Sequence, residues 1–297
     1  MAFDEGPGPE PVKTRSEYEQ GVVGLVDKTL GLWARKLPQY LVMVGLTGVA
    51  ITILQALVLI GMFGLLGLSL IDLLSSSPID VVFSLVLGVA SPTYMVILLL
   101  LSIVGIIVYA VVAGGAIHYT IIEYESPGNG DVRESFSFAF GRVGSLIGVQ
   151  ILQSLIVGGL AILSVFIMMF DLLIGFAMIF LILYVAVKLA PAIAIVVAED
   201  RPAVASISRS WQITGGLFWH VFLAQLLIGI VILVINAVLA IGLGMFLPFI
   251  FPDYVLIVFL VSLISTLLVS SINYIYLAVL YKDLEARGTS GQYDWWQ

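Results

Sequence analysis

The chain has 297 residues, of which 61% are hydrophobic and only 10% charged, and its mean hydropathy is +1.16. Soluble domains carry about 25% charged residues, so this composition excludes a soluble globular protein and predicts an integral membrane protein. The net charge is −7 and there is no cysteine, which excludes disulfides, thiolate chemistry and cysteine metal sites. We expect no nucleic-acid partner, and two histidines far apart in sequence disfavour a histidine metal centre.

The first residues, 1–15, are rich in proline, glycine and acids and lack the basic region and apolar core of a signal peptide. We interpret them as a mobile cytoplasmic tail. From Ser16 to Lys36 apolar residues alternate with charges. This segment predicts an amphipathic helix at the membrane surface, with Trp33 as an interfacial anchor.

Six stretches are long and apolar enough for the roughly 20 residues that a transmembrane helix needs. They are Pro38 to Leu70, Thr93 to Ile122, Gly144 to Phe170, Leu172 to Ala198, Leu217 to Phe246 and Tyr254 to Tyr281. The first is longer than a span requires, which indicates tilt or a break near Gly61, Gly64 and Gly67. The segment Asp72 to Pro92 is too short in apolar residues to span, and we expect an interfacial or re-entrant piece there.

Two further polar segments resemble the one before the first span. Val132 to Val143 carries three phenylalanines, and Glu199 to Trp219 is the longest polar interruption in the apolar part of the chain. Trp211 and Trp219 in the latter are predicted interfacial anchors. The sequence thus predicts an all-α integral membrane protein with six transmembrane helices in three hairpins. Each hairpin follows an amphipathic surface helix on the cytoplasmic side.

The basic residues predict the orientation. With six spans, eleven of the twelve Lys and Arg residues fall on one side of the membrane, and the remaining one, Lys188, lies inside a span. The three connectors on the opposite side contain none. By the positive-inside rule both termini are cytoplasmic, in a multi-pass protein of the plasma membrane.

The three surface helices align with one another. Thr29-Leu30, Ser135-Phe136 and Ser210-Trp211 coincide, and an alanine followed seven residues later by a glutamate recurs at the end of each second span, at Ala116, Ala192 and Ala278. This pattern favours three repeats, 16–123, 131–199 and 200–285, within one membrane domain, 16–287, followed by a tail, 288–297. Boundary residues common to any array of hairpins are the alternative explanation.

The segment AEDRPAVASISRSWQITGGLFWHVF resembles a motif of the membrane domain that is fused to some glycerophosphodiester phosphodiesterases and also stands alone in bacterial and archaeal membrane proteins. The matching residues are Glu199, Ser210, Trp211, Gly215 or Gly216, Phe218 and Trp219. The resemblance implies a six-span membrane module. It carries over no catalytic residue, because the phosphodiesterase domain and its metal ligands have no counterpart in this sequence.

Lys188 is the residue whose burial in the membrane costs the most free energy. At 1.5 Å per residue it lies roughly 16 Å from the cytoplasmic end of its span. Gln150, Gln225 and Asn273 fall at a similar depth, roughly 12 to 15 Å by the same rise. The four side chains are therefore a candidate intramembrane polar site. The structural alternative is that Lys188 snorkels, aided by a distortion at Pro191, while the amides join helices.

His118 and His220 lie near span ends and are expected to be interfacial, and the Gly144-xxx-Gly148 spacing permits close helix contact. No phosphate loop, nucleophile elbow or metal-binding motif occurs, so we expect no enzyme activity, cofactor or metal. We predict a scaffold, regulatory or lipid-organising module whose partners are the bilayer and a membrane protein or a second copy of itself. The alternative is a small transporter or flippase with a polar site around Lys188.

Overall fold

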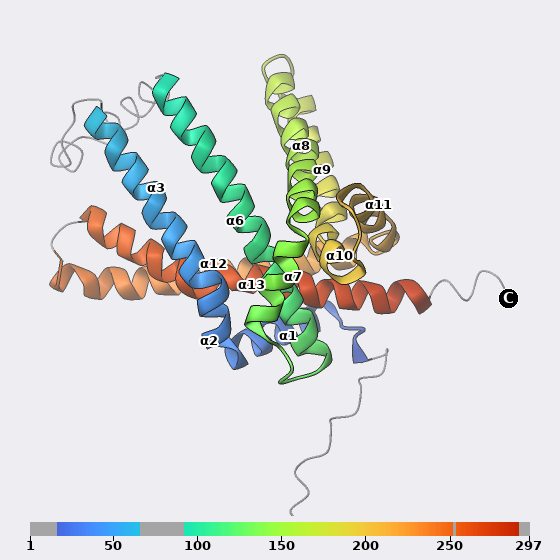
Figure 1. Cartoon of the computed structure of the whole chain (residues 1–297). Coiled ribbons are helices and arrows are strands. Elements are labelled where there is room, and N and C mark those ends of the chain that lie inside the picture. Colours follow the sequence, from blue (N-terminus) through green and yellow to red (C-terminus); the bar gives the residue numbers. More distant parts are fainter. Residues whose placement is uncertain (1–16, 66–91, 252–253, 291–297) are drawn as a thin grey trace, which may run out of the picture. The chain divides into compact units, whose positions relative to one another are not determined.

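The computed structural model describes residues 17–65, 92–251 and 254–290, and every regular element in these ranges is helical (Figure 1). Six helices are long and apolar enough to cross a membrane. They are Leu37–Val58, Leu99–Glu125, Val143–Met168, Leu172–Glu199, Phe218–Phe249 and Leu256–Gly288. The length and composition of these helices confirm the prediction of an all-helical membrane protein with six spans. The predicted re-entrant piece, Asp72 to Pro92, lies almost entirely outside the described residues.

The helices, with the labels of Figure 1, follow one another in this order. They are α1 (Val22–Arg35), α2 (Leu37–Tyr40), η2 (Leu41–Gly45), α3 (Leu46–Leu65), α6 (Pro92–Glu125), α7 (Val132–Gly141), α8 (Val143–Met168), α9 (Leu172–Leu189), α10 (Ala192–Glu199), α11 (Ala203–Ile213), α12 (Phe218–Phe246), η3 (Leu247–Phe249) and α13 (Tyr254–Ser290).

Two spans depart from regular α-helix. The fourth ends as α9 at Leu189 and resumes as α10 at Ala192, because the ring of Pro191 cannot continue the hydrogen-bond ladder. The first contains a π-helical turn, η2, directly after the four-residue α2. Its helix is continuous through Gly61 and Gly64, so the irregularity of this span lies at its start and not at those glycines, while Gly67 is outside the described residues.

A short helix precedes the first, third and fifth spans: α1, α7 and α11. Each buries the hydroxyl residue that the sequence alignment makes equivalent, since Thr29, Ser135 and Ser210 are completely buried. The alanines Ala116, Ala192 and Ala278 are buried in the same way. The aligned positions of the three segments therefore share the same degree of burial, and the threefold repeat stays a prediction.

The helices form two compact units, each built from separate stretches of chain. Unit 1 takes in the described parts of Met1–Tyr40, Ala110–Ile232 and Ser271–Gln297. Its core consists of the final turns of α6, α10 and α13, where most side chains are buried. The short helices and the ends of the spans that hold the charged residues belong to this unit.

Within unit 1, α8 and α9 lie side by side and α11 packs on both (Figure 1). The turn between α8 and α9 is capped by Asp171, whose carboxylate accepts hydrogen bonds from the backbone N–H groups of Leu173 and Ile174 at 2.9 and 3.1 Å. Gly148 permits the close approach of α11, because a Cβ there would lie 2.9 Å from that of Ala203, whereas Gly144 meets nothing.

Unit 2 consists of the described parts of Leu41–Tyr109 and Leu233–Ser270. Here the first span touches α13 almost backbone to backbone. A Cβ added at Gly45 would lie 2.5 Å from the carbonyl oxygen of Leu267, and one at Gly48 would lie 2.8 Å from Cγ2 of Thr266. Small residues at such contacts are how helices associate in membranes, where no hydrophobic force drives them together.

Candidate functional site

Charged side chains gather where α6, α10 and α13 end, and we call this region of unit 1 the charged end. Three acids at or near the ends of α6, α10 and α13 each pair with a basic or imidazole group near the start of an earlier span. Glu123 Oε1 lies 2.9 Å from Lys36 Nζ, Asp200 pairs with Arg142, and Asp283 Oδ2 lies 2.8 Å from His220 Nε2. These three end pairs join the end of α6 to the turn between α1 and α2, the end of α10 to the start of α8, and α13 to α12.

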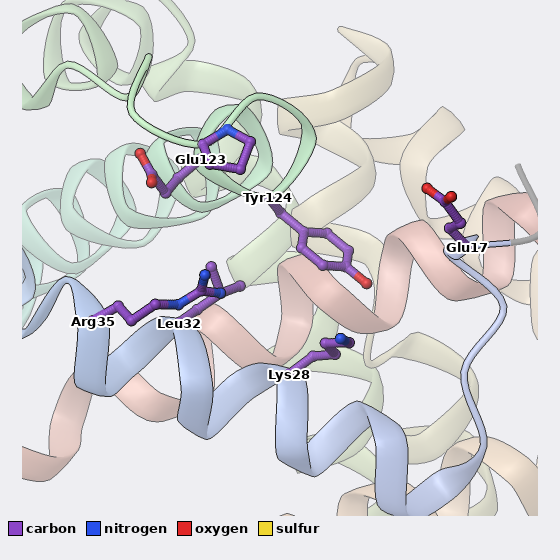
Figure 2. Close-up of a pocket in the computed structure, with 7 residues that line it drawn as sticks. Glu17, Lys28, Leu32, Arg35, Glu123 and Tyr124 are labelled. Carbon is purple, nitrogen blue, oxygen red and sulfur yellow. The ribbon is translucent and has the colours of Figure 1, made fainter. Parts of the chain in front are cut away.

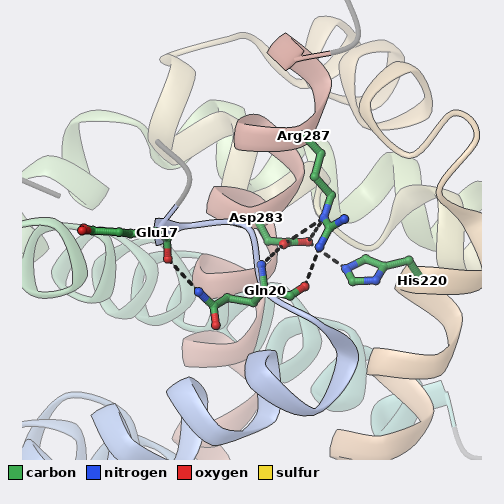
Figure 3. Close-up of polar contacts among 5 residues, drawn as sticks. All are labelled: Glu17, Gln20, His220, Asp283 and Arg287. Carbon is green, nitrogen blue, oxygen red and sulfur yellow. Dashed lines mark hydrogen bonds and ion pairs between the residues drawn. The ribbon is translucent and has the colours of Figure 1, made fainter. Parts of the chain in front are cut away.

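Asp283 is the most connected of these acids and has no exposed surface (Figure 3). Its carboxylate accepts from the backbone N–H of Gln20 at 2.6 Å, from His220, and from Arg287 Nε at 3.0 and 3.1 Å. Arg287 in turn donates to the carbonyl oxygen of Gln20 at 2.6 Å. The segment that leads into α1 is thereby held against α12 and α13 by one buried carboxylate.

Other contacts connect the three segments to one another. Lys282 of α13 bridges Glu125 of α6 and Glu285 of its own helix, at 2.5 and 2.8 Å. The hydroxyl of Tyr281 donates to Glu199 of α10 at 3.3 Å and to Glu285 at 3.2 Å. Because these partners come from different segments, the charged end forms one continuous network rather than three separate pairs.

Lys188 is 5% exposed, and its surroundings account for its burial. Its Nζ donates to the carbonyl oxygen of Thr214 at 2.9 Å, at the C-terminal end of α11. A cation is stabilised there by the last carbonyls and by the helix dipole. The rings of Tyr184 and Trp211 lie 5.8 and 5.7 Å from Nζ and add cation–π attraction. The backbone of Lys188 also accepts from Ser210 Oγ at 2.7 Å.

The three amides of the candidate polar site are less buried than Lys188. Gln225 and Asn273 have exposed side chains, and Gln150 is half-buried. Across the described ranges no hydrogen bond joins any of them to another or to Lys188. The common layer is therefore not formed by direct contact among these four residues, and a shared role for them stays a prediction.

The three tryptophans predicted as anchors are accessible: Trp211 and Trp219 are exposed and Trp33 is half-buried. His118 accepts or donates a hydrogen bond with Ser135 Oγ at 3.2 Å and stacks on Phe138 with ring centroids 4.2 Å apart. It therefore joins α6 to α7. Where the structure describes the chain, no group of acids, histidines or cysteines is arranged to hold a metal ion.

A cavity of about 430 Å³ lies between α1 and the end of α6 (Figure 2). Its lining is Glu17, Lys28, Leu32, Arg35, Glu123, Tyr124 and Pro127. Lys28, Leu32 and Arg35 follow one another on one face of α1 by four-and-three spacing, opposite Glu123 and Tyr124. Tyr18 packs edge-on against Tyr124, with centroids 5.3 Å apart, and burial, aided by Glu125, raises the pKa of the Tyr18 phenol, so it is uncharged at neutral pH.

No protein-family model, curated protein or solved structure matches the chain.

Neither Asp283 nor the cavity was predicted from the sequence. The acids predicted at the ends of spans were Glu123, Glu199 and Glu285, whereas Asp283 is the acid that joins the segment before α1 to α12 and α13. A signal was present, because Tyr276, Leu280, Asp283 and Leu284 follow helical spacing and all are buried. An acid on the buried stripe of an apolar helix requires a partner, and that rule alone points to Asp283.

Proposed function

We propose that this chain is a non-enzymatic scaffold of the plasma membrane that presents a rigid charged end to the cytoplasm and organises a partner and lipid around it. The observation that carries the proposal is the network of the charged end, in which the acids and bases that finish the helices bind one another. The buried acids of this network, Glu123 and Asp283, each need their partners in one relative placement of the helices. Buried ion pairs are weak evidence for stability alone, so specificity of arrangement is their natural role.

The three short helices support a surface role. Each exposes a large apolar side chain while burying its hydroxyl residue: Val23 on α1, Phe140 on α7 and Val204 on α11. Val23 and Val204 both precede the aligned hydroxyl residue by six positions, and each is 72% exposed. An apolar side chain on a helix beside the start of a span is suited to lie among lipid headgroups. These helices, and the three hairpins behind them, are proposed to lie at the cytoplasmic surface.

The resemblance of residues 199–219 to the membrane domain associated with glycerophosphodiester phosphodiesterases agrees with a module that works beside another protein. Ser210 and Trp211 of that motif contribute to the environment of Lys188. Their contacts are architectural, since they hold α11 against α9. We therefore extend to this chain the idea of a membrane module, without any phosphodiesterase activity.

Transport is the weaker candidate. Its main support was a charged residue near the bilayer centre, and the ammonium of Lys188 instead binds a carbonyl four residues before α12 begins. Such a bond satisfies the ammonium without a substrate. Two of the three amides expected beside it are exposed.

Photo-crosslinking in growing cells tests the scaffold role. A photoreactive residue at Phe140 or Val204 is expected to give a discrete protein adduct. The same residue at Phe170, which is exposed in the turn that follows α8, serves as the control. Asp283→Asn, which weakens the charged end, is expected to remove the adducts while the protein stays in the membrane. Equal labelling at all three positions, or adducts that survive Asp283→Asn, would contradict the proposal.

The transport alternative is tested with purified protein in liposomes. The scaffold role predicts that fluorescent lipid crosses the bilayer no faster than in protein-free liposomes, with Lys188→Met as the matched variant. Accelerated lipid movement that Lys188→Met abolishes would establish the alternative.

A further inference from the structure

The fifth span carries an exposed amide in its apolar part. Gln225 lies on α12, and in the part of the chain that the structure describes its amide has no hydrogen-bond partner. Trp219, the predicted interfacial anchor, precedes it by six residues, about 9 Å at 1.5 Å per residue. A glutamine side chain is too short to cover that distance, so the amide cannot reach the headgroups. A polar group without a partner in hydrocarbon costs free energy, and Gln225 therefore requires a partner from outside the described chain.

The side of α12 that holds Gln225 is open to a second helix. The buried residues of this helix lie on one face and are Val221, Ala224 and Ile228. Beside that face, Phe222, Gln225 and Gly229 follow one another by three-and-four spacing. Gln225 and Gly229 are exposed, and a Cβ added at Gly229 would meet nothing within 4 Å. Contacts between membrane helices combine small residues, which let the backbones approach, with amides that hydrogen-bond across the interface.

The exposed amide of the sixth span lacks such surroundings. Asn273 is the one exposed position of α13 between residues 271 and 287. Ile272, Ile275 and Tyr276 around it are buried. A helix that approached Asn273 would find no other exposed residue of this part of α13 beside it, so Gln225 is the amide that a second helix can pack against.

A second copy of this chain is the partner that fits the open side of α12. An amide has one acceptor oxygen and two N–H donors, so two facing amides exchange a pair of hydrogen bonds. Copies inserted with the same orientation hold Gln225 at the same depth, and a two-fold axis brings identical residues together. We propose that the protein self-associates through α12, with the two Gln225 side chains bound to each other beside Gly229. The proposal does not rest on the scaffold role, because Gln225 takes no part in the charged end.

Disulfide trapping tests which side of α12 meets the second copy. The chain has no cysteine, so one introduced thiol reports only on its own position. Gly229→Cys lies on the proposed side. Ile230→Cys is the matched control, because Ile230 is 48% exposed and lies at nearly the same depth but is turned by about 100° around the helix. Two cysteines whose Cα atoms are more than about 7 Å apart cannot be bridged. We therefore expect oxidation of native membranes to link Gly229→Cys into dimers and to leave Ile230→Cys monomeric.

Fluorescence energy transfer between full-length copies, labelled at the C-terminus and diluted with lipid in liposomes, measures the association itself. Gln225→Leu removes both hydrogen bonds between the amides. We expect it to need about tenfold more protein per lipid for half-association, a change of about 1.4 kcal/mol. Gln225→Asn keeps the amide group and is expected to retain most of the association.

Equal disulfide formation at positions 229 and 230, or association unchanged in Gln225→Leu, would overturn the proposed interface. Energy transfer no greater than for randomly distributed monomers at every protein-to-lipid ratio would show that the chain does not self-associate. A disulfide product with the mass of one copy plus a different protein would assign α12 to another membrane protein instead. If Gln225→Leu is not recovered, the two cysteine variants, which both keep Gln225, decide the matter.

Discussion

Asp283→Asn is the most informative single change, because the carboxylate holds three parts of the chain at once. The substitution keeps the size of the side chain and one acceptor oxygen but removes the charge. Asp283 has no exposed surface and accepts hydrogen bonds from Gln20, His220 and Arg287. Hydrogen bonds to a charged group contribute about 1.5 to 3 kcal/mol, against about 0.5 to 1.5 kcal/mol for neutral ones. Losing about 1 kcal/mol at each of three bonds lowers the free energy of unfolding by about 3 kcal/mol.

That loss agrees with the about 3 to 5 kcal/mol expected when one partner of a buried ion pair is removed, at its lower end because Arg287 is partly exposed. Unfolding in mixed micelles of increasing sodium dodecyl sulfate measures the free energy. Hydrogen–deuterium exchange of the Gln20 amide, which donates directly to Asp283, measures the local effect and is expected to rise by at least tenfold.

Asp27→Asn is the matched control, because Asp27 is exposed on α1 and has no ion-pair partner in the described ranges. Its free energy of unfolding is expected to change by less than about 0.5 kcal/mol. If Asp283→Asn is equally mild, or if exchange at Gln20 does not change, the view that one carboxylate anchors the segment before α1 is refuted.

Three further predictions concern the rest of the chain. Lys188→Met is expected to lower the free energy of unfolding by only about 1 kcal/mol, and a loss above about 4 kcal/mol would contradict a capping role. Gly45→Leu places a Cβ 2.5 Å from a carbonyl oxygen of α13 and is expected to cost about 3 kcal/mol or more, whereas Gly105→Leu, which meets nothing, is the control for the same unfolding measurement. In this cysteine-free chain, a membrane-impermeant maleimide is expected to label Asp171→Cys in intact cells and Asn129→Cys only after permeabilisation; the reverse pattern would contradict cytoplasmic termini.

Depth along a helix and rotation about it are different quantities, and the four-residue polar site shows the consequence. The rise per residue places Lys188, Gln150, Gln225 and Asn273 at similar depths. It says nothing about the face of the helix on which each lies, which packing decides. Gln225 and Asn273 are exposed, while Lys188 is buried against α11. Similar depth therefore does not imply that the four side chains touch one another.

The sequence by itself determined the number and approximate positions of the spans, because crossing a bilayer depends on the composition of about 20 consecutive residues. It also placed the break at Pro191 and the short helices before three spans, which are local properties of the chain. Only the tertiary structure decided which charges meet. Glu123 with Lys36, Asp283 with Gln20 and His220, and Lys188 with the end of α11 join distant residues through the rotation and packing of whole helices. The cavity beside Lys28 and Arg35 arises in the same way, where α1 lies against the end of α6.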